Sequence, residues 1–267
     1  MNQDQWLATH PYLRHIAELH AAVEAVASEI SIPTIAVPNF EGYASDYRAG
    51  IPLLESDAVE LHLECAEDML VALTTRLASV RLPGNLADEC RSLTVYLRRE
   101  GSLTPTRPPS NGSISPRSQG LLRFLTWTVV EMYLRPALRA FENWRNQDLW
   151  VRAYCPTCGS LPVMAHLVAV DEARARSLHC GCCRTRWLYR RHGCPLCGEE
   201  DERRLQSLWL EQESGLRIDC CQECGGYLKT YTGGAPEVLL SDWASIHLDV
   251  LAGDRGLKRL AGSLYEI

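Results

Sequence analysis

Four pairs of cysteines with the spacing Cys-X-X-Cys lie between residues 155 and 224 of this 267-residue chain. Such a pair places two thiolates on one tight turn with both sulfurs facing the same point, and two such turns complete a tetrahedral S4 shell around zinc or iron. The sequence therefore predicts two metal sites, with the ligands Cys155, Cys158, Cys180 and Cys183 in the first and Cys194, Cys197, Cys221 and Cys224 in the second.

The four pairs form two near-copies of one unit. The first copy contains CPTCG and CGCC, the second contains CPLCG and CQECGG, and their first cysteines, Cys155 and Cys194, are 39 residues apart. A repeat of roughly 40 residues is typical of an internal structural unit. Within each copy the loop between the two pairs is short, and closing a short loop costs less entropy than interleaving the copies. We therefore expect each copy to bind its own metal ion, as tandem ribbons.

Glycine follows the second cysteine of three pairs, at Gly159, Gly198 and Gly225. A glycine there tolerates a positive φ, which lets the chain turn and aim backbone N–H groups at the sulfurs. Arg184 takes this position in the remaining pair. That turn is expected to be the least regular of the four.

The other four cysteines are expected not to bind metal. Neither Cys182 nor Cys220 has a cysteine at the two-residue spacing, so both are expected to be spare thiols. Cys65 and Cys90 lie in helical patterns far from the remaining cysteines. Because an unpaired cysteine behaves as a small apolar side chain, we expect both to be buried.

A disulfide framework is the main alternative use of these thiols. Disulfide-dense domains are usually short and secreted, whereas this chain has 267 residues and begins with MNQDQWLATH, which has no basic region and no apolar run of the signal-peptide kind. A redox dithiol would need one such pair in a βαβ setting. Metal binding in the cytoplasm is therefore the favoured interpretation.

Composition and charge restrict the partners. Hydrophobic residues make up 46% of the chain, and no stretch approaches the roughly 18 to 20 apolar residues of a membrane span. Residues 150–232 carry 11 Lys and Arg against 10 Asp and Glu, whereas a nucleic-acid-binding ribbon normally has a clear basic excess. The nucleic-acid alternative depends on one local run of basic residues: Arg184, Arg186, Arg190 and Arg191. The favoured interpretation of this run is that its positive charge compensates two anionic metal sites.

The pattern of apolar residues divides the chain into a helical half and a strand-rich half. Helical spacing predicts helices at about 6–30, 56–80, 86–99 and 119–146, with an irregular connection at 31–52 and an exposed loop at 102–118. Short alternating segments predict strands at 161–170, 175–180, 184–191, 205–211, 216–220 and 227–231, followed by a helix at 236–252. The expected fold class is α+β: an all-α domain at 1–149, metal-binding ribbon modules at 150–192 and 193–232, and a C-terminal helical extension at 233–267.

Several segments together resemble a known family, the formate dehydrogenase accessory protein family FdhE. They are CPTCGSLP (155–162), LHCGCCRTRW (178–187), WLYRRHGCPLC (187–197), CQECGGYLK (221–229) and LSDWASIHLD (240–249), with a looser match at HPYLRHIAEL (10–19). The resemblance implies two rubredoxin-like centres, so that iron is a candidate as well as zinc. It also implies a cytoplasmic protein that binds the molybdenum- or tungsten-containing catalytic subunit of formate dehydrogenase.

The function expected from these observations is that of a non-enzymatic assembly factor required for active formate dehydrogenase. No general base, activated nucleophile or nucleotide-binding loop is evident in the sequence. A first alternative is a rubredoxin-like redox protein that passes electrons to or from the same catalytic subunit. A second alternative is a zinc-ribbon nucleic-acid-binding protein.

Overall fold

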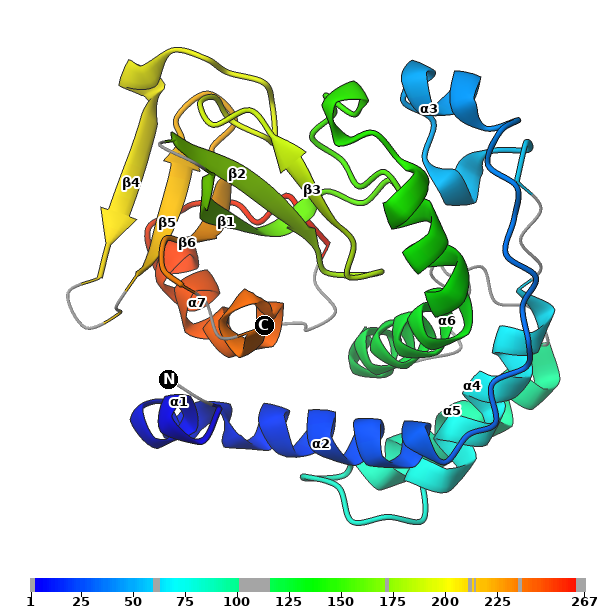
Figure 1. Cartoon of the computed structure of the whole chain (residues 1–267). Helices are drawn as coiled ribbons and strands as arrows, with labels where there is room; N and C mark the ends of the chain where they lie inside the picture. Colours follow the sequence, from blue (N-terminus) through cyan, green and yellow to red (C-terminus); the bar gives the residue numbers. More distant parts are fainter. Residues whose placement is uncertain are drawn as a thin grey trace.

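A helical first half is followed by a six-stranded sheet and a final helix (Figure 1). The structure is a computed structural model that describes residues 3–59, 63–100, 116–170, 173–210, 213, 215–234 and 237–262. The first half contains α1 (Gln3–Thr9), α2 (Arg14–Ser28), α3 (Ala44–Ala49), α4 (Glu64–Leu77), α5 (Leu86–Glu100) and α6 (Pro116–Trp144), with 3-10 turns at Pro11–Leu13, Leu53–Glu55 and Gln147–Leu149. The predicted α+β class is confirmed.

The helix predictions succeed where the pattern is uninterrupted and fail at local breaks. The ranges of α5 and α6 agree closely with the predicted helices. The predicted helix at 6–30 is divided, because Pro11 disfavours helical backbone at His10, which has φ −126° and ψ 62°. The predicted helix at 56–80 begins only at Glu64, since the Ser56 hydroxyl is used in a turn, where it donates to Asp46 and accepts from the Ala58 N–H. Residues 102–115 of the predicted loop lie outside the described residues, and residues 116–118 belong to α6 instead of the loop.

The predicted helix at 236–252 is wrong over its first half. Two 3-10 turns, Glu237–Leu240 and Asp242–Ser245, precede α7 (Ile246–Asp254). Side chains from elsewhere occupy the carbonyls that a continuous helix would use: Lys229 donates to the Asp242 carbonyl at 3.0 Å, and the Trp6 indole donates to the Ala244 carbonyl at 3.0 Å. These competing donors favour the shorter turns over the α-helical ladder.

The two ribbons form one sheet with the strand order β3-β2-β1-β6-β5-β4. The first ribbon contributes β1 (Pro162–Val170), β2 (Ala173–Cys180) and β3 (Arg186–Tyr189), and the second contributes β4 (Leu205–Trp209), β5 (Leu216–Cys221) and β6 (Tyr227–Tyr231). Each ribbon is antiparallel, and the parallel pairing of β1 with β6 joins them, with Met164 opposite Lys229 and His166 opposite Tyr231. Sequence reasoning found the strands but not this pairing.

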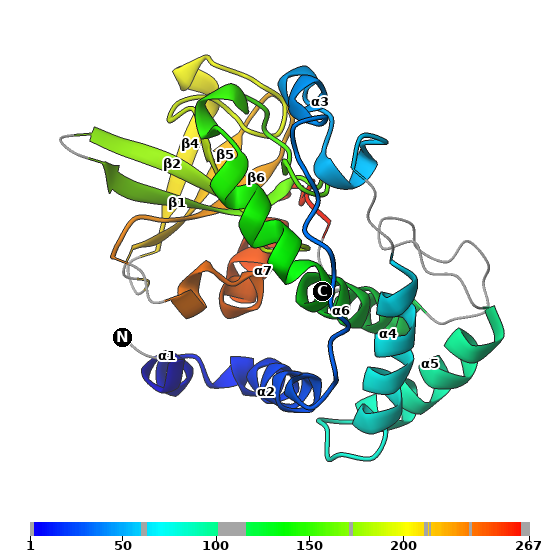
Figure 2. The same cartoon turned by 45° about the vertical axis from the view of Figure 1, so that its right-hand side comes forward.

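Helices cover the sheet through two apolar cores. In the first core, the helical half packs against the first ribbon and its cysteines, with Tyr47, Trp150 and Trp187 among the buried aromatic residues. In the second core, Trp6 and Leu13 pack with residues of β5, β6 and α7. Figures 1 and 2 show α7 between the sheet and the N-terminal helices. The helical half therefore contacts both ribbons. The division into four domains stays a prediction.

A buried group of charges attaches the C-terminal segment to β6. The Lys229 ammonium, only 1% exposed, lies 2.6 Å from an Asp242 oxygen and 2.8 Å from an Asp249 oxygen. Arg259 lies 2.7 Å from the other Asp242 oxygen. Although burial opposes ionisation, Lys229 and Arg259 keep the pKa of Asp242 below its ordinary value. The two carboxylates depend on these cations, because a buried charge without a partner is strongly unfavourable.

Replacing Lys229 by methionine is expected to destabilise the protein by about 3 to 5 kcal/mol, because Asp242 and Asp249 lose the more deeply buried of the two cations that they share. Urea unfolding followed by circular dichroism measures the change. A matched control is Arg91→Met, which breaks an exposed pair with Asp88 and is expected to cost about 0 to 1 kcal/mol. Equal losses in the two variants would contradict the role given to burial.

Candidate metal centres

The first four cysteines converge on one point. Sγ of Cys155 lies 3.5 Å from Sγ of Cys183, and Sγ of Cys158 lies 3.4 Å from Sγ of Cys180. All four sulfurs lie within 4.8 Å of one another. Sulfurs bound tetrahedrally at about 2.3 Å from one ion are about 3.8 Å apart. The arrangement has the size of an S4 shell, and all four cysteines are free of disulfide bonds.

Backbone hydrogen bonds shape the two turns of this centre in the same way. The N–H of Thr157 donates to Cys155 Sγ at 3.4 Å, and the N–H of Cys182 donates to Cys180 Sγ at 3.4 Å. Each turn is closed by the N–H of its first cysteine, from Cys155 to the Ser160 carbonyl and from Cys180 to the Thr185 carbonyl. The N–H groups of Thr157 and Cys182, which donate to sulfur, favour the thiolate, the form that binds metal.

The residue after each turn has a left-handed backbone, which the sequence predicted for the three glycines but not for Arg184. Gly159, Gly198 and Gly225 have φ values of +74°, +85° and +65°. Arg184 has φ +60° and is the single non-glycine residue with positive φ in the described part of the chain. A residue with a side chain is strained in this region. The turn that the sequence marked as irregular therefore keeps the same backbone form as the others at an energetic cost.

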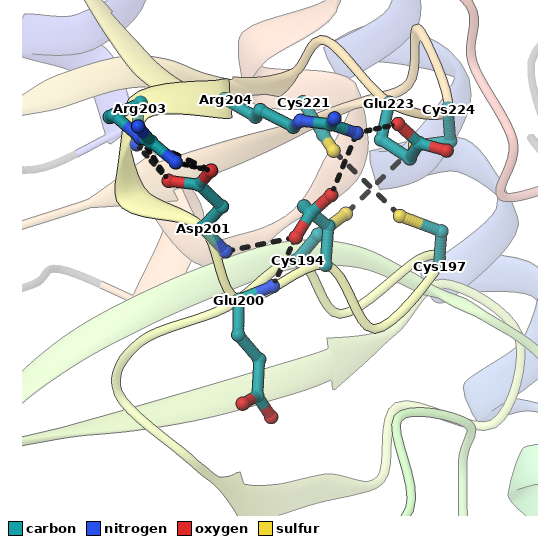
Figure 3. A network of polar contacts seen from close by, with 10 residues as sticks. Cys194, Cys197, Glu200, Asp201, Arg203, Arg204, Cys221, Glu223 and Cys224 are labelled. Atoms are coloured by element: carbon teal, nitrogen blue, oxygen red, sulfur yellow. Dashed lines mark hydrogen bonds and ion pairs between the residues drawn. The ribbon is translucent and has the colours of Figure 1, made fainter.

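The second group of cysteines has the same architecture. Sγ of Cys194 lies 3.9 Å from Sγ of Cys224, and Sγ of Cys197 lies 3.7 Å from Sγ of Cys221 (Figure 3). The N–H of Leu196 donates to Cys194 Sγ at 3.4 Å, and the N–H of Gly226 donates to Cys224 Sγ at 3.4 Å. The sulfurs are therefore grouped as the loop lengths predict, with no mixing between the copies.

Ion pairs surround the second centre. Arg204 lies 3.2 Å from Glu199 and also pairs with Glu223, beside the cysteines in Figure 3. Arg203 lies 2.8 Å from Asp201 and lowers the pKa of that carboxyl. The turn that leads into β4 is thus held against the cysteines by charge pairs, and its arginines are already engaged by carboxylates.

The two centres differ in exposure. All four cysteines of the first centre are buried, whereas Cys197 of the second centre is exposed and Cys224 is half-buried. The helical half seals the first centre, because the N–H groups of Leu53 and Leu54 donate to the carbonyls of Pro156 and Thr157, each at 2.9 Å. The first centre is therefore part of the joint between the halves, and the second reaches the surface.

A cavity of about 280 Å³ lies beside the first centre, between α2, α6 and the turn of Asp242–Ser245. Its lining includes His20, His179, Cys182 and Arg184. Burial lowers the pKa of His20 to about 4 and that of His179 to about 3, so both imidazoles are neutral at pH 7. The strained Arg184 thus contributes to a polar cavity, which the sequence pattern gave no means of locating.

The spare cysteines lie outside both groups of four. Sγ of Cys182 is 3.6 Å from the Ser160 hydroxyl, and Cys220 contacts the Gln206 carbonyl at 3.5 Å.

Cys90 is fully buried, as predicted. The prediction that Cys65 is buried is wrong. Because α4 begins at Glu64, Cys65 lies in the first turn of the helix on its solvent-facing side, next to the buried Ala66.

Comparison with known proteins relates this chain to a family. Residues 154–191 match the model of the FdhE central domain. The FdhE homologue of Shewanella baltica (strain OS195) is 36% identical over 186 residues, covering 68% of this chain and 56% of the relative. The chain belongs to the FdhE family. The FdhE homologue of Aquifex aeolicus is 31% identical over 145 residues, covering 52% of this chain and 50% of the relative.

The matches to FdhE relatives span about half the length of those proteins. The crystal structure of the FdhE protein from Pseudomonas aeruginosa has a TM-score of 0.63 with 23% identity, and the match covers 97% of this chain and 91% of that one. The fold described above is therefore the FdhE fold over nearly the whole chain.

Relieving the strain at Arg184 is expected to stabilise the protein. Arg184→Gly should raise the free energy of unfolding by up to about 1 kcal/mol, because glycine adopts positive φ without a steric cost. Arg184→Ala is the matched control, since it removes the same side chain but keeps a Cβ. Thermal unfolding measures both. A glycine variant no more stable than the alanine variant would contradict the proposed strain.

The choice of cysteines predicts metal content. Cys182→Ser and Cys220→Ser are each expected to keep two metal ions per chain, whereas Cys183→Ser and Cys221→Ser should lose one and unfold their ribbon locally, because three thiolates leave the S4 shell incomplete. Elemental analysis of the purified variants gives the count. Loss of a metal ion from the Cys182→Ser protein would assign the first centre to a different set of ligands.

Proposed function

We propose that each centre binds one tetrahedrally coordinated metal ion, iron or zinc. The ligands of the first are Cys155, Cys158, Cys180 and Cys183, and those of the second are Cys194, Cys197, Cys221 and Cys224. Support comes from sulfur separations of 3.4 to 3.9 Å across both groups, which fit an S4 shell. When bound, each ion cross-links the two turns of its own ribbon and stabilises short strands that have little apolar surface of their own.

We propose further that the chain is a cytoplasmic, non-enzymatic accessory protein required for active formate dehydrogenase, and that it binds the catalytic subunit of that enzyme. The observation that carries this proposal is FdhE family membership together with the FdhE fold over nearly the whole chain. No helix in the described part of the chain is long and apolar enough to cross a membrane.

The geometry suggests how the chain holds its client. The buried first centre fixes the helical half against the sheet, and the cavity beside Arg184 opens between the two parts. An extended segment of the client can enter such a cavity between α2 and α6. In this proposal the metal ions give the surface its shape, and the recognition is made by side chains of the helical half and of the first ribbon.

A second candidate function is electron transfer to or from the same catalytic subunit. It is favoured by one observation, the exposure of Cys197 and the partial exposure of Cys224 in the second centre. An iron ion bound there would lie close to the surface, where a redox partner can approach. The nucleic-acid alternative receives less support, because Arg190, one of the four arginines on which it depends, is paired with Glu200.

Complementation tests the accessory function. Cells lacking their own protein are supplied with the full-length chain, Cys155→Ser or Cys224→Ser, and formate oxidation is measured. The full-length chain should restore activity, whereas both variants should fail because one ribbon loses its order. Failure of the full-length chain, although it is produced and loaded with metal, would contradict the proposed function.

The visible spectrum of the same proteins separates the two candidates. Ferric thiolate absorbs strongly in the visible range and zinc thiolate does not. A full-length chain that contains only zinc and still restores formate oxidation excludes electron transfer. A chain that restores activity only when it carries iron favours electron transfer over scaffolding.

A further inference from the structure

Three potential metal ligands meet at a place unrelated to the cysteines. His10 follows α1, Glu213 lies between β4 and β5, and His247 lies in α7. Nε2 of His10 is 2.7 Å from Oε1 of Glu213, and Nε2 of His247 is 3.0 Å from the same oxygen. The side chains are only 8%, 8% and 14% exposed for His10, Glu213 and His247. His10 and His247 belong to two of the segments that carry the family resemblance, HPYLRHIAEL and LSDWASIHLD. Neither segment contributes a ligand to the cysteine centres.

The hydrogen bonds of His10 hold its ring so that Nε2 faces Glu213. Nδ1 lies 3.0 Å from the carbonyl oxygen of Trp6, which can only accept. A proton on Nδ1 donates to this carbonyl and leaves the Nε2 lone pair available to a metal ion beside Glu213. The Thr9 hydroxyl also lies 2.9 Å from Nδ1. At 2.7 Å, Nε2 and the Glu213 oxygen share either a ring proton or a metal ion in its place. A backbone carbonyl bonded to the second ring nitrogen is the usual way in which a protein orients a metal-binding histidine.

The other two groups lack the partners that a purely structural contact would supply. The second carboxylate oxygen of Glu213, Oε2, is buried without a hydrogen bond, and neither ring nitrogen of His247 has a well-aligned partner in the described part of the chain. Burial opposes ionisation of Glu213, but the contacts with His247 and His10 outweigh it and lower the pKa of the carboxyl. An anion that is about nine-tenths buried is thus faced by two imidazoles and is left with unused electron pairs.

We propose that His10, Glu213 and His247 bind a divalent first-row transition-metal ion, a third metal site distinct from the two thiolate centres. Ligand atoms about 2.1 Å from one ion lie about 3.0 to 3.4 Å apart in octahedral or tetrahedral geometry, close to the separations from Glu213 Oε1. Two imidazoles and one carboxylate suit Zn²⁺, Fe²⁺ or Co²⁺ and leave coordination positions open for water or an exchangeable ligand.

The surroundings favour a rigid site. The Trp6 ring stacks on His10 with a centroid distance of 3.7 Å, and the Trp6 indole is anchored to the Ala244 carbonyl. Tyr12 contacts both imidazoles edge-on and is 56% exposed, so it forms the solvent side of the site. An ion bound here would join α1, the β4–β5 connection and α7.

Cobalt binding to the full-length protein tests the proposal. The thiolate centres are first loaded with zinc and verified at two ions per chain, and Co²⁺ is then added under equilibrium dialysis. We expect one Co²⁺ per chain with the zinc retained, and weak d–d bands without the intense sulfur-to-cobalt charge transfer of a thiolate site. Glu213→Gln and His247→Gln should each weaken Co²⁺ binding at least 100-fold, because each removes one of three ligands.

His15→Gln is the matched control, since it removes an exposed imidazole 3.6 Å from Glu18 and should leave cobalt binding unchanged. Each variant must keep two zinc ions and the circular dichroism of the parent chain. His10→Gln replaces either ligand variant that fails this check. Absence of the additional Co²⁺, exchange of cobalt into the thiolate centres only, or unchanged binding in the ligand variants would overturn the proposal and leave a protonated imidazole as the cation beside Glu213.

Discussion

The fold depends on the convergence of four buried sulfurs at the boundary between the helices and the sheet. Thiolates in an apolar core are unfavourable unless a cation and N–H groups compensate their charge. The turns at Cys155 and Cys180 supply such N–H groups, and the backbone of Leu53 and Leu54 binds the first turn from the helical side. The arrangement of α2, α6 and the first ribbon follows from this junction, as does the position of the cavity beside it.

The second centre has the same turns as the first but lies in a more exposed and more highly charged environment. Cys197 is exposed and Cys224 is half-buried, beside paired arginines and carboxylates, so water and counter-charges already reduce the cost of these thiolates. One repeated unit therefore serves as an internal joint in its first copy and as an external feature in its second. The repeat in the sequence records common architecture and gives no sign of this division of roles.

The sequence predicted what depends on neighbouring residues. The grouping of the sulfurs follows from loop length, and the positive φ after each turn follows from the chemistry of glycine. The break at His10, the start of α4 and the two turns before α7 were missed because a proline, a turn-forming serine and donors from distant residues override helical spacing. The parallel pairing of β1 with β6, and the meeting of His10, Glu213 and His247, join residues far apart in the chain, and no local pattern encodes such contacts.

The hydrogen bond from Trp6 to the Ala244 carbonyl spans 238 positions of the chain. The pairing of β1 with β6 likewise forms only after β6 has been synthesised. A ribosome adds roughly 5 to 20 residues per second, so α1 emerges on the order of 10 to 50 s before its partner exists. During that interval Trp6 and Leu13 lack the residues of β5, β6 and α7 that bury them in the folded chain. Translation thus imposes an order on assembly: the first ribbon can close early, whereas the layer formed by α1 and α7 is completed last.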